Sequence, residues 1–241
     1  NIKRVTYDQS PNMGNSLIKQ KSRPVRRFLR GEPIKIMTPV INTGIPGKYK
    51  DPFSHYIPFP IEPVCHINHR PYTSNGCIRF LCVGKLAEVR KNHILLIDAL
   101  EKIGANCSIT FVGAGPGFTL ANHAYYENFM MRSKESKIRG GIKILMDLSH
   151  KETLKLYETH DILVLPAVGE AHGQCILEAL AAGCPVISSD DCGASGYISS
   201  GYNGFIFQKN NLASLIERIN FFVNNPSKIA EFGRNALALI A

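Results

Sequence analysis

Residues 163–186 read LVLPAVGEAHGQCILEALAAGCPV, and this stretch predicts a strand, a helix and a second strand in succession. Its apolar beginning predicts a buried strand, and the run 173–182 predicts a helix that Gly183 closes. A second strand is expected at 185–188. Free amides at the start of the helix, together with the helix dipole, favour an anion such as a phosphate. Gly173 has no side chain to block its approach.

The rest of the C-terminal part continues this alternation of strands and helices. Ser149 and Glu152 form a capping box, which marks the start of one helix. Strands that alternate with helices predict an α/β fold, a Rossmann-like parallel sheet with helices on both faces and a ligand crevice at the carboxyl ends of the strands. The expected strands are 78–83, 107–112, 141–145, 162–165, 185–188 and 204–207, and the expected helices are 91–103, 122–137, 149–159, 173–182 and two that begin at Leu212 and Pro226.

Two carboxylates flank the predicted phosphate-binding turn. Glu178 falls in the second turn of the helix, where it can accept two hydrogen bonds from a vicinal diol such as ribose. Glu170 lies just ahead of the helix and can reach the next group along such a ligand. The spacing of the two Glu residues alone is weak support for a nucleotide site. Stronger support comes from the order of the elements, in which a strand is followed by a Glu, a helix that begins with glycine, and a second Glu.

A second polar loop follows the strand expected at 78–83. Gly84 permits a sharp turn, and Lys85 and Lys91 flank the loop. Lysine pairs on loops are usually only solvated, but two ammonium groups beside an anion-binding helix start would neutralise a diphosphate.

A cofactor and a metal are not expected. The run VGAGPG at 112–117 lacks the third glycine of a dinucleotide fingerprint, because position 118 is Phe118, so it is interpreted as a tight turn beside the cleft. Cys65, His66 and His69 resemble metal ligands, but no second ligand pair stands at zinc-site spacing.

The charge is divided unevenly along the chain. Residues 1–75 carry 12 Lys and Arg against 4 Asp and Glu, whereas residues 76–241 carry 16 against 15. Seven of the basic residues lie between Lys19 and Lys35, in a segment that is either simply solvated or in contact with phosphates, an anionic membrane or nucleic acid. The seven cysteines form no CxxC pair and predict reduced core residues in a reducing compartment.

The first 75 residues do not predict a complete domain. Residues 2–7 are a candidate strand, and residues 38–75 are rich in Pro, Gly, Asn and Ser and are interpreted as loops and a linker. We therefore place a domain boundary near residues 71–76 and expect a complete α/β domain at 76–241.

Residues 76–241 resemble the C-terminal, donor-binding domain of retaining glycosyltransferases of the family 4-like (group 1) type, which have a GT-B fold. Four motifs carry the resemblance: VGKL with RKN after Cys82, FVGAGP at 111–116, the Glu170–Glu178 block with its EALAAGCPV ending, and GYNGF at 201–205. The resemblance implies transfer of a sugar from a nucleoside-diphosphate sugar to a glycan or lipid-linked acceptor, without a metal. It further implies that residues 76–241 are the nucleotide-sugar donor-binding domain, that residues 1–75 are a remnant of the N-terminal acceptor domain and the linker, and that the rest of the acceptor domain lies upstream of Asn1.

Roles for individual positions follow from the resemblance. Lys85 and Lys91 would hold the diphosphate and assist departure of the leaving group, Glu178 would bind the ribose hydroxyls, and Glu170 would lie against the donor sugar. The strand around Ile144 would line the base pocket. The amides expected at the distal phosphate are those of Gly173, Gln174 and Cys175.

The chain departs from the family pattern in two places. Ala171-His172-Gly173 replaces the usual Gly-Phe-Gly, so His172 either positions the sugar or phosphate or replaces an aromatic wall. The segment 192–197 lacks a commonly used Glu. The alternatives are a non-catalytic module that binds sugar nucleotides and a basic nucleic-acid-binding protein, although no known nucleic-acid-binding motif supports the latter. The resemblance favours a cytoplasmic protein with peripheral contact to an anionic membrane face.

Overall fold

A computed structural model describes residues 5–7, 35–38, 54–56, 76–115, 120–170 and 172–240. The first three ranges are short strands, β1 (Val5–Tyr7), β2 (Lys35–Thr38) and β3 (Ser54–Tyr56), which pair in parallel in the order β1-β2-β3. The strand predicted at 2–7 is thus confirmed in part. The interpretation of 38–75 as loops alone is wrong at β3, because a three-residue strand is too short to show an alternating pattern.

Several predictions concern residues outside these ranges. They are the basic segment from Lys19 to Arg30, the group of Cys65, His66 and His69, and the end of the glycine-rich turn at 116–118.

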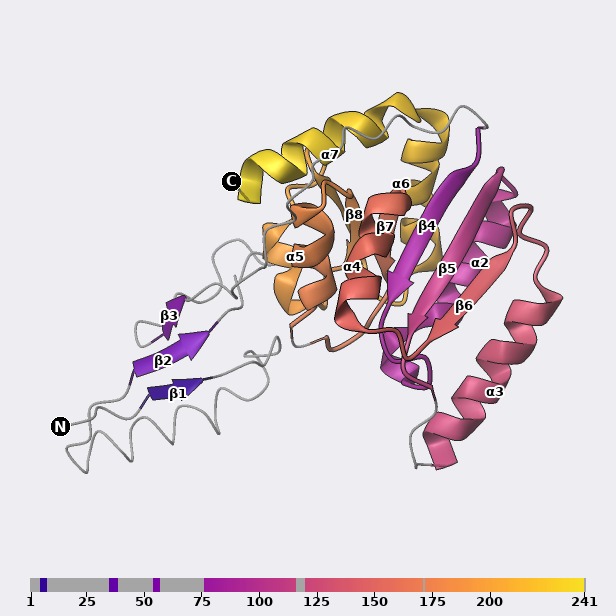
Figure 1. Cartoon of the computed structure of the whole chain (residues 1–241), viewed down its shortest axis with the longest axis horizontal. Helices are drawn as coiled ribbons and strands as arrows, with labels where there is room; N and C mark the ends of the chain where they lie inside the picture. The colour runs from indigo at the N-terminus through magenta and orange to yellow at the C-terminus, as the bar shows by residue number, and fades with distance from the viewer. Residues whose placement is uncertain are drawn as a thin grey trace.

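The second sheet has six parallel strands in the order β6-β5-β4-β7-β8-β9 (Figure 1). Each lies within about a residue of its predicted position, so the predicted α/β, Rossmann-like fold is confirmed. The strands are β4 (Ile78–Val83), β5 (Cys107–Gly113), β6 (Ile142–Met146), β7 (Ile162–Leu165), β8 (Val186–Ser189) and β9 (Gly204–Phe207).

Helices connect these strands and cover the sheet. Ser149 caps α4 through the predicted capping box, in which the Ser149 amide donates to Glu152 Oε2 at 2.9 Å. No helix in the described ranges is both long and apolar enough to cross a membrane. The helices are η1 (Val89–Lys91), α2 (His93–Ile103), α3 (Leu120–Glu135), α4 (His150–Thr159), α5 (Gln174–Ala181), η2 (Gly193–Tyr197), α6 (Leu212–Asn224) and α7 (Ser227–Ile240).

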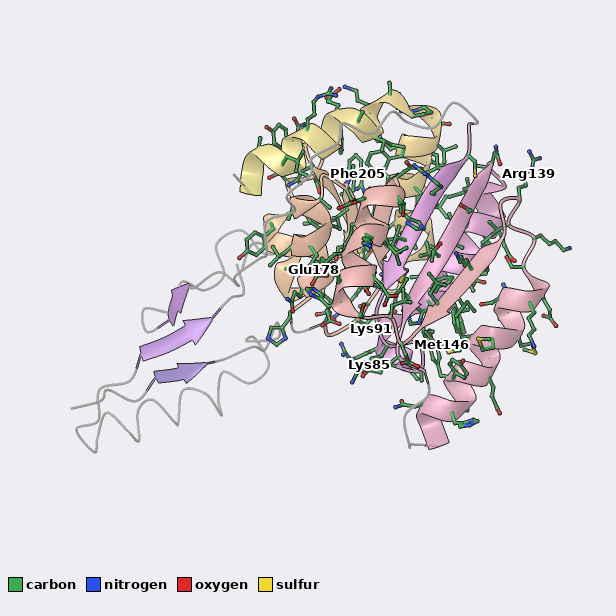
Figure 2. The ribbon with its side chains drawn as sticks, in the orientation of Figure 1. Lys85, Lys91, Arg139, Met146, Glu178 and Phe205 are labelled. Carbon is green, nitrogen blue, oxygen red and sulfur yellow. The ribbon has the colours of Figure 1, made fainter. Side chains whose placement is uncertain are left out.

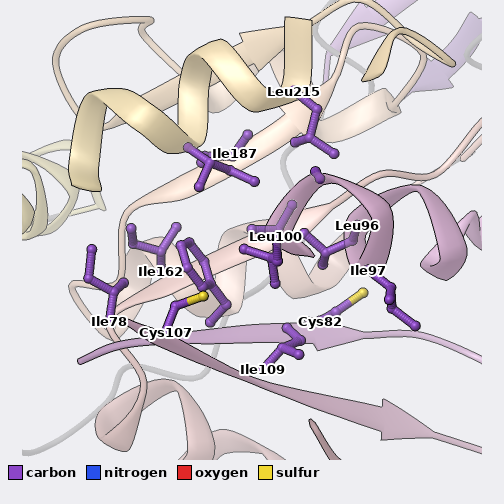
Figure 3. Packing of buried hydrophobic residues seen from close by; sticks show 14 of the residues in the cluster. Ile78, Cys82, Leu96, Ile97, Leu100, Cys107, Ile109, Ile162, Ile187 and Leu215 are labelled. Atoms are coloured by element: carbon purple, nitrogen blue, oxygen red, sulfur yellow. The ribbon is translucent and has the colours of Figure 1, made fainter. Parts of the chain in front are cut away.

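Both faces of the sheet are buried. Along β4, Phe80 belongs to a core that includes α2 and α6, whereas its neighbour Leu81 belongs to a second core beneath α4 and α5. Figure 3 shows the first core, where Leu96 of α2 and Leu215 of α6 gather over the strands. Successive side chains of a strand point to opposite faces of the sheet. A strand that is apolar almost throughout, such as β4, is therefore expected where helices cover both faces.

The strand order contains a switch point. From β4 the chain moves outward through β5 to β6, then returns to β7 on the other side of β4 and continues through β8 to β9. The loops after β4 and β7 therefore lead away in opposite directions, and in sheets of this kind ligands bind between such loops, at the carboxyl ends of the strands. Figure 2 shows Lys85, Lys91 and Met146 near this end of the sheet, with Arg139 at the opposite end.

Candidate functional site

Lys91 and Glu170 meet across the switch point. Lys91 ends η1 in the loop after β4, and Glu170 lies in the loop after β7. The Lys91 Nζ contacts Glu170 Oε2, and the Arg90 Nη1 lies 2.7 Å from the same oxygen. The side chains of Lys91 and Glu170 are only 11% and 9% exposed. The two predicted residues are therefore brought together as a buried ion pair.

The charges of this group decide the state of Glu170. Burial alone would raise the pKa of the Glu170 carboxyl, but the positive charges of Lys91 and Arg90 outweigh burial and lower its pKa below the ordinary value. Glu170 is thus a carboxylate at neutral pH, and it shares two cations.

Lys85 occupies a different environment from Lys91. Its side chain is 68% exposed, and its Nζ lies 3.3 Å from Glu88 Oε1. The other oxygen of Glu88 lies 2.7 Å from Arg90 Nη2, so Glu88 and Arg90 connect Lys85 to Glu170. The sequence-based prediction named Lys85 and Lys91 but missed Arg90, although Arg90 stands inside the quoted motif.

Glycines allow the loops after β4 and β5 to approach each other. A Cβ on Gly84 would lie 3.1 Å from Lys91 Cδ, so the Lys91 stem crosses directly over Gly84. A Cβ on Gly113 would lie 1.9 Å from the Gly84 carbonyl oxygen, which no side chain could tolerate. Gly84 therefore makes room for the stem of the buried lysine, and Gly113 at the end of β5 lets the two loops approach each other.

The helix start predicted as an anion site requires a glycine. Gly173 precedes α5 with φ of +65°, and a Cβ there would lie 2.4 Å from Cys192 Sγ. The first amides of α5, those of Gln174 and Cys175, lack intrahelical acceptors, as in any helix. His172 is half-buried ahead of this turn.

A second loop fixes the segment that carries Glu170. The Glu170 amide donates to the Asp191 carbonyl at 3.1 Å, and the Gly193 amide donates to the Glu170 carbonyl at 2.8 Å. The buried Asp191 carboxylate accepts from the Gly169 amide at 2.9 Å and from Lys209 Nζ at 3.0 Å. Sequence reasoning missed Asp191 and Lys209, since their partners are distant along the chain.

Glu178 is held by two side chains of α4. His150 Nε2 lies 3.0 Å from Glu178 Oε1, and the Tyr157 hydroxyl donates to Oε2 at 2.8 Å. The Glu178 side chain is 11% exposed and that of His150 is 57% exposed. Burial, together with the Glu178 charge, raises the pKa of Tyr157 well above its ordinary value, so the phenol stays protonated. His150 and Tyr157 stand seven positions apart, which places them on one face of a helix.

Three of the predicted side chains are close enough to act electrostatically on Cys175 in the first turn of α5. Burial raises the pKa of the Cys175 thiol well above its usual range, and the charges of Lys91, Glu170 and Glu178 all act on that thiol. Ile144, which was expected to line the base pocket, packs against the core on the α2 face. The exposed side chain at the end of its strand is Met146, whose Sδ accepts from the Tyr126 hydroxyl at 3.2 Å.

The fold and the site together define a Rossmann-like domain with charged and amide groups arranged at its switch point. The chain belongs to the glycosyl transferases group 1 family, whose model matches residues 70–238. The six-stranded unit has the Rossmann-like architecture found in GT-B glycosyltransferases, as predicted.

Relatives and solved structures agree with this family. An uncharacterized glycosyltransferase of Methanocaldococcus jannaschii is 29% identical over 61% of this chain and 38% of that protein. The D-inositol 3-phosphate glycosyltransferase of Streptomyces avermitilis is 24% identical over 59% of this chain and 30% of that protein. The chain thus spans less than half the length of these relatives.

Among solved structures, HepE of Anabaena in complex with UDP superposes with a TM-score of 0.75 and 17% identity, over 98% of this chain and 66% of that one. WaaG, described as a glycosyltransferase involved in lipopolysaccharide biosynthesis, gives a TM-score of 0.65 and 19% identity over 98% of this chain and 70% of that one. At sequence identities below 20%, this similarity shows a shared fold and no more.

Proposed function

We propose that residues 76–241 form the donor half of a retaining, metal-independent glycosyltransferase that takes a hexose from a nucleoside-diphosphate sugar. The observation that carries the proposal is the Lys91–Glu170 pair, buried at the switch point beside the start of α5 and flanked by Glu178. Anion-binding groups and a diol-binding carboxylate in one crevice match the successive parts of such a donor.

The diphosphate would lie at the start of α5. The free amides of Gln174 and Cys175 and the helix dipole favour a phosphate there. Lys91 and Arg90 supply positive charge at the edge of the same crevice, and the exposed Lys85 can reach a ligand from solvent. Positive charge held in place before the reaction stabilises the leaving nucleoside diphosphate as the bond to the sugar breaks.

Glu170 would lie against the donor sugar. It is a buried carboxylate whose oxygen Oε2 is shared by Lys91 and Arg90. Its remaining lone pairs can accept hydrogen bonds from sugar hydroxyls. In this scheme Glu170 and the cations position the donor, and stabilisation of the leaving group replaces a protein nucleophile.

Two partners besides the donor are expected, a sugar acceptor and an anionic membrane face. The acceptor, a glycan or a lipid-linked sugar, would bind outside residues 76–241. The basic residues between Lys19 and Lys35 would draw the protein to an anionic membrane face, where such acceptors reside. HepE, whose fold is similar, was solved with UDP, which makes UDP sugars the first donors to test.

Calorimetry tests donor binding directly. The chain is titrated with UDP, GDP and ADP, each with EDTA and each with Mg²⁺. We expect one nucleotide to bind equally well in both buffers. We expect Lys91→Gln to weaken its binding at least about tenfold, as loss of a charged hydrogen-bond donor would. Lys102→Gln, on the exposed last turn of α2, is the matched control. Absence of binding, or binding only with Mg²⁺, would contradict the proposal.

A further inference from the structure

Glu178 has a defined orientation before any ligand arrives. Each of its two carboxylate oxygens receives a hydrogen bond, one at 3.0 Å from His150 and one at 2.8 Å from Tyr157. Both donors come from α4, whereas Glu178 belongs to α5. The carboxylate plane is therefore fixed by a neighbouring helix and not by its own helix alone.

Glu178 can still accept further hydrogen bonds after the two from His150 and Tyr157. A carboxylate has about four lone-pair positions on its two oxygens. His150 and Tyr157 occupy one position on each oxygen, which leaves one on each for a ligand. Two acceptors side by side on one rigid plane match the two neighbouring hydroxyls of a ribose.

Tyr157 is suited to a fixed orienting role. Its side chain is fully buried, and burial keeps its phenol protonated, so it donates to Glu178 at any ordinary pH. A phenol buried in an apolar core needs a partner for its hydroxyl. The Glu178 carboxylate is that partner.

His150 orients the other oxygen of Glu178 from the N-terminal end of α4. It is the first residue of α4 and is more than half exposed. Because a carboxylate only accepts, the Nε2 that faces it carries the hydrogen.

We propose that Tyr157 and His150 are positioning residues that aim the free lone pairs of Glu178 at the ribose diol, and so make this site select ribonucleotides over 2′-deoxyribonucleotides. The inference rests on the proposed function, because it requires a nucleotide in this crevice. It adds two residues that the family motifs do not include.

The test is a ratio of affinities. The probes are the nucleoside diphosphate that binds best among UDP, GDP and ADP, and its 2′-deoxy analogue. For the unmodified chain we expect the ribonucleotide to bind at least about tenfold more tightly, as loss of a hydrogen bond to a charged acceptor would predict. In Tyr157→Phe, which keeps the ring and removes the hydroxyl, we expect the ratio to fall to about threefold or less.

Further variants separate positioning from stability. His150→Ala should lower the ratio, and His150→Gln, which retains a donor, should restore it. Tyr125→Phe removes a hydroxyl that accepts from the His93 amide at 2.8 Å, away from Glu178, and should leave the ratio unchanged.

The outcomes are distinguishable. If no nucleoside diphosphate binds the unmodified chain, the proposed function itself fails. If nucleotides bind but the unmodified chain does not prefer ribose, the inference is overturned. It is also overturned if Tyr157→Phe weakens both probes equally, since that result would assign Tyr157 a purely structural role.

Discussion

His93 allows the pH dependence of stability to be worked out from the structure. Its side chain is fully buried, with its ring centroid 5.2 Å from that of Phe129 and 5.5 Å from that of Phe111. Its Nε2 has no hydrogen-bond partner among the described residues. Burial first, and then the charge of Lys91, lower the pKa of His93 from 6.5 to about 3. The ring is therefore neutral in the folded protein.

The sign of the effect follows from proton binding. Between pH 6.5 and about 3 the unfolded chain binds a proton at His93 that the folded chain does not, so stability falls as the pH falls through this window. Each pH unit corresponds to roughly 1.4 kcal/mol. Acidification to pH 5 should therefore cost about 2 kcal/mol, and the full shift sets a limit of about 5 kcal/mol.

Urea unfolding at pH 8 and pH 5 measures this contribution. His93→Phe keeps an aromatic ring against Phe111 and Phe129 but removes the titrating group, and His93→Leu is a second variant of the same kind. We expect the unmodified chain to lose about 2 kcal/mol more than either variant over this range. His123→Ala removes a histidine that is 59% exposed and serves as the control. Equal losses in the unmodified chain and both His93 variants would refute the argument.

Three further predictions concern the site. Lys91→Met leaves Glu170 paired with Arg90 alone, and we expect urea unfolding to show a loss of at most about 3 kcal/mol in the free energy of unfolding. If Lys91→Met is as stable as a variant of an exposed lysine, the Lys91–Glu170 pair is not buried. Gly173→Ala must place a Cβ 2.4 Å from a sulfur at φ of +65°, so thermal unfolding should reveal a loss of about 1–3 kcal/mol, and an unchanged melting temperature would count against the turn. Asp191→Asn removes the charge that Lys209 contacts at 3.0 Å while keeping an acceptor for the Gly169 amide; we expect weaker binding of UDP-glucose with little loss of stability, and an unaltered calorimetric affinity for UDP-glucose would show that Asp191 does not support the Glu170 loop.

The six-stranded sheet could be predicted from the sequence because its local signals all indicated the same elements. The apolar runs, the glycine after α5 and the capping box at Ser149 each act within a few residues, and all pointed to alternating strands and helices. Strands β2 and β3 were missed because three or four residues carry no measurable periodicity.

The candidate site was predictable only in part. Lys91, Glu170 and Gly173 stood in recognisable motifs, and the structure brings Lys91 and Glu170 into contact. The partners that orient the carboxylates could not be derived, because a contact such as Tyr157 with Glu178 joins two helices through tertiary packing. The seven-residue spacing of His150 and Tyr157 on α4 was the one local signal available.

In the proposed complex, Glu178 faces the ribose and Glu170 faces the sugar of one bound donor. Calorimetry with UDP and UDP-glucose, on the unmodified chain, Glu170→Ala and Glu178→Ala, tests this most directly. We predict that Glu178→Ala weakens both ligands. We also predict that Glu170→Ala weakens UDP-glucose but spares UDP, because removal of Glu170 frees Lys91 and Arg90 for the diphosphate. Binding of both ligands to both variants with the affinity of the unmodified chain would contradict the account.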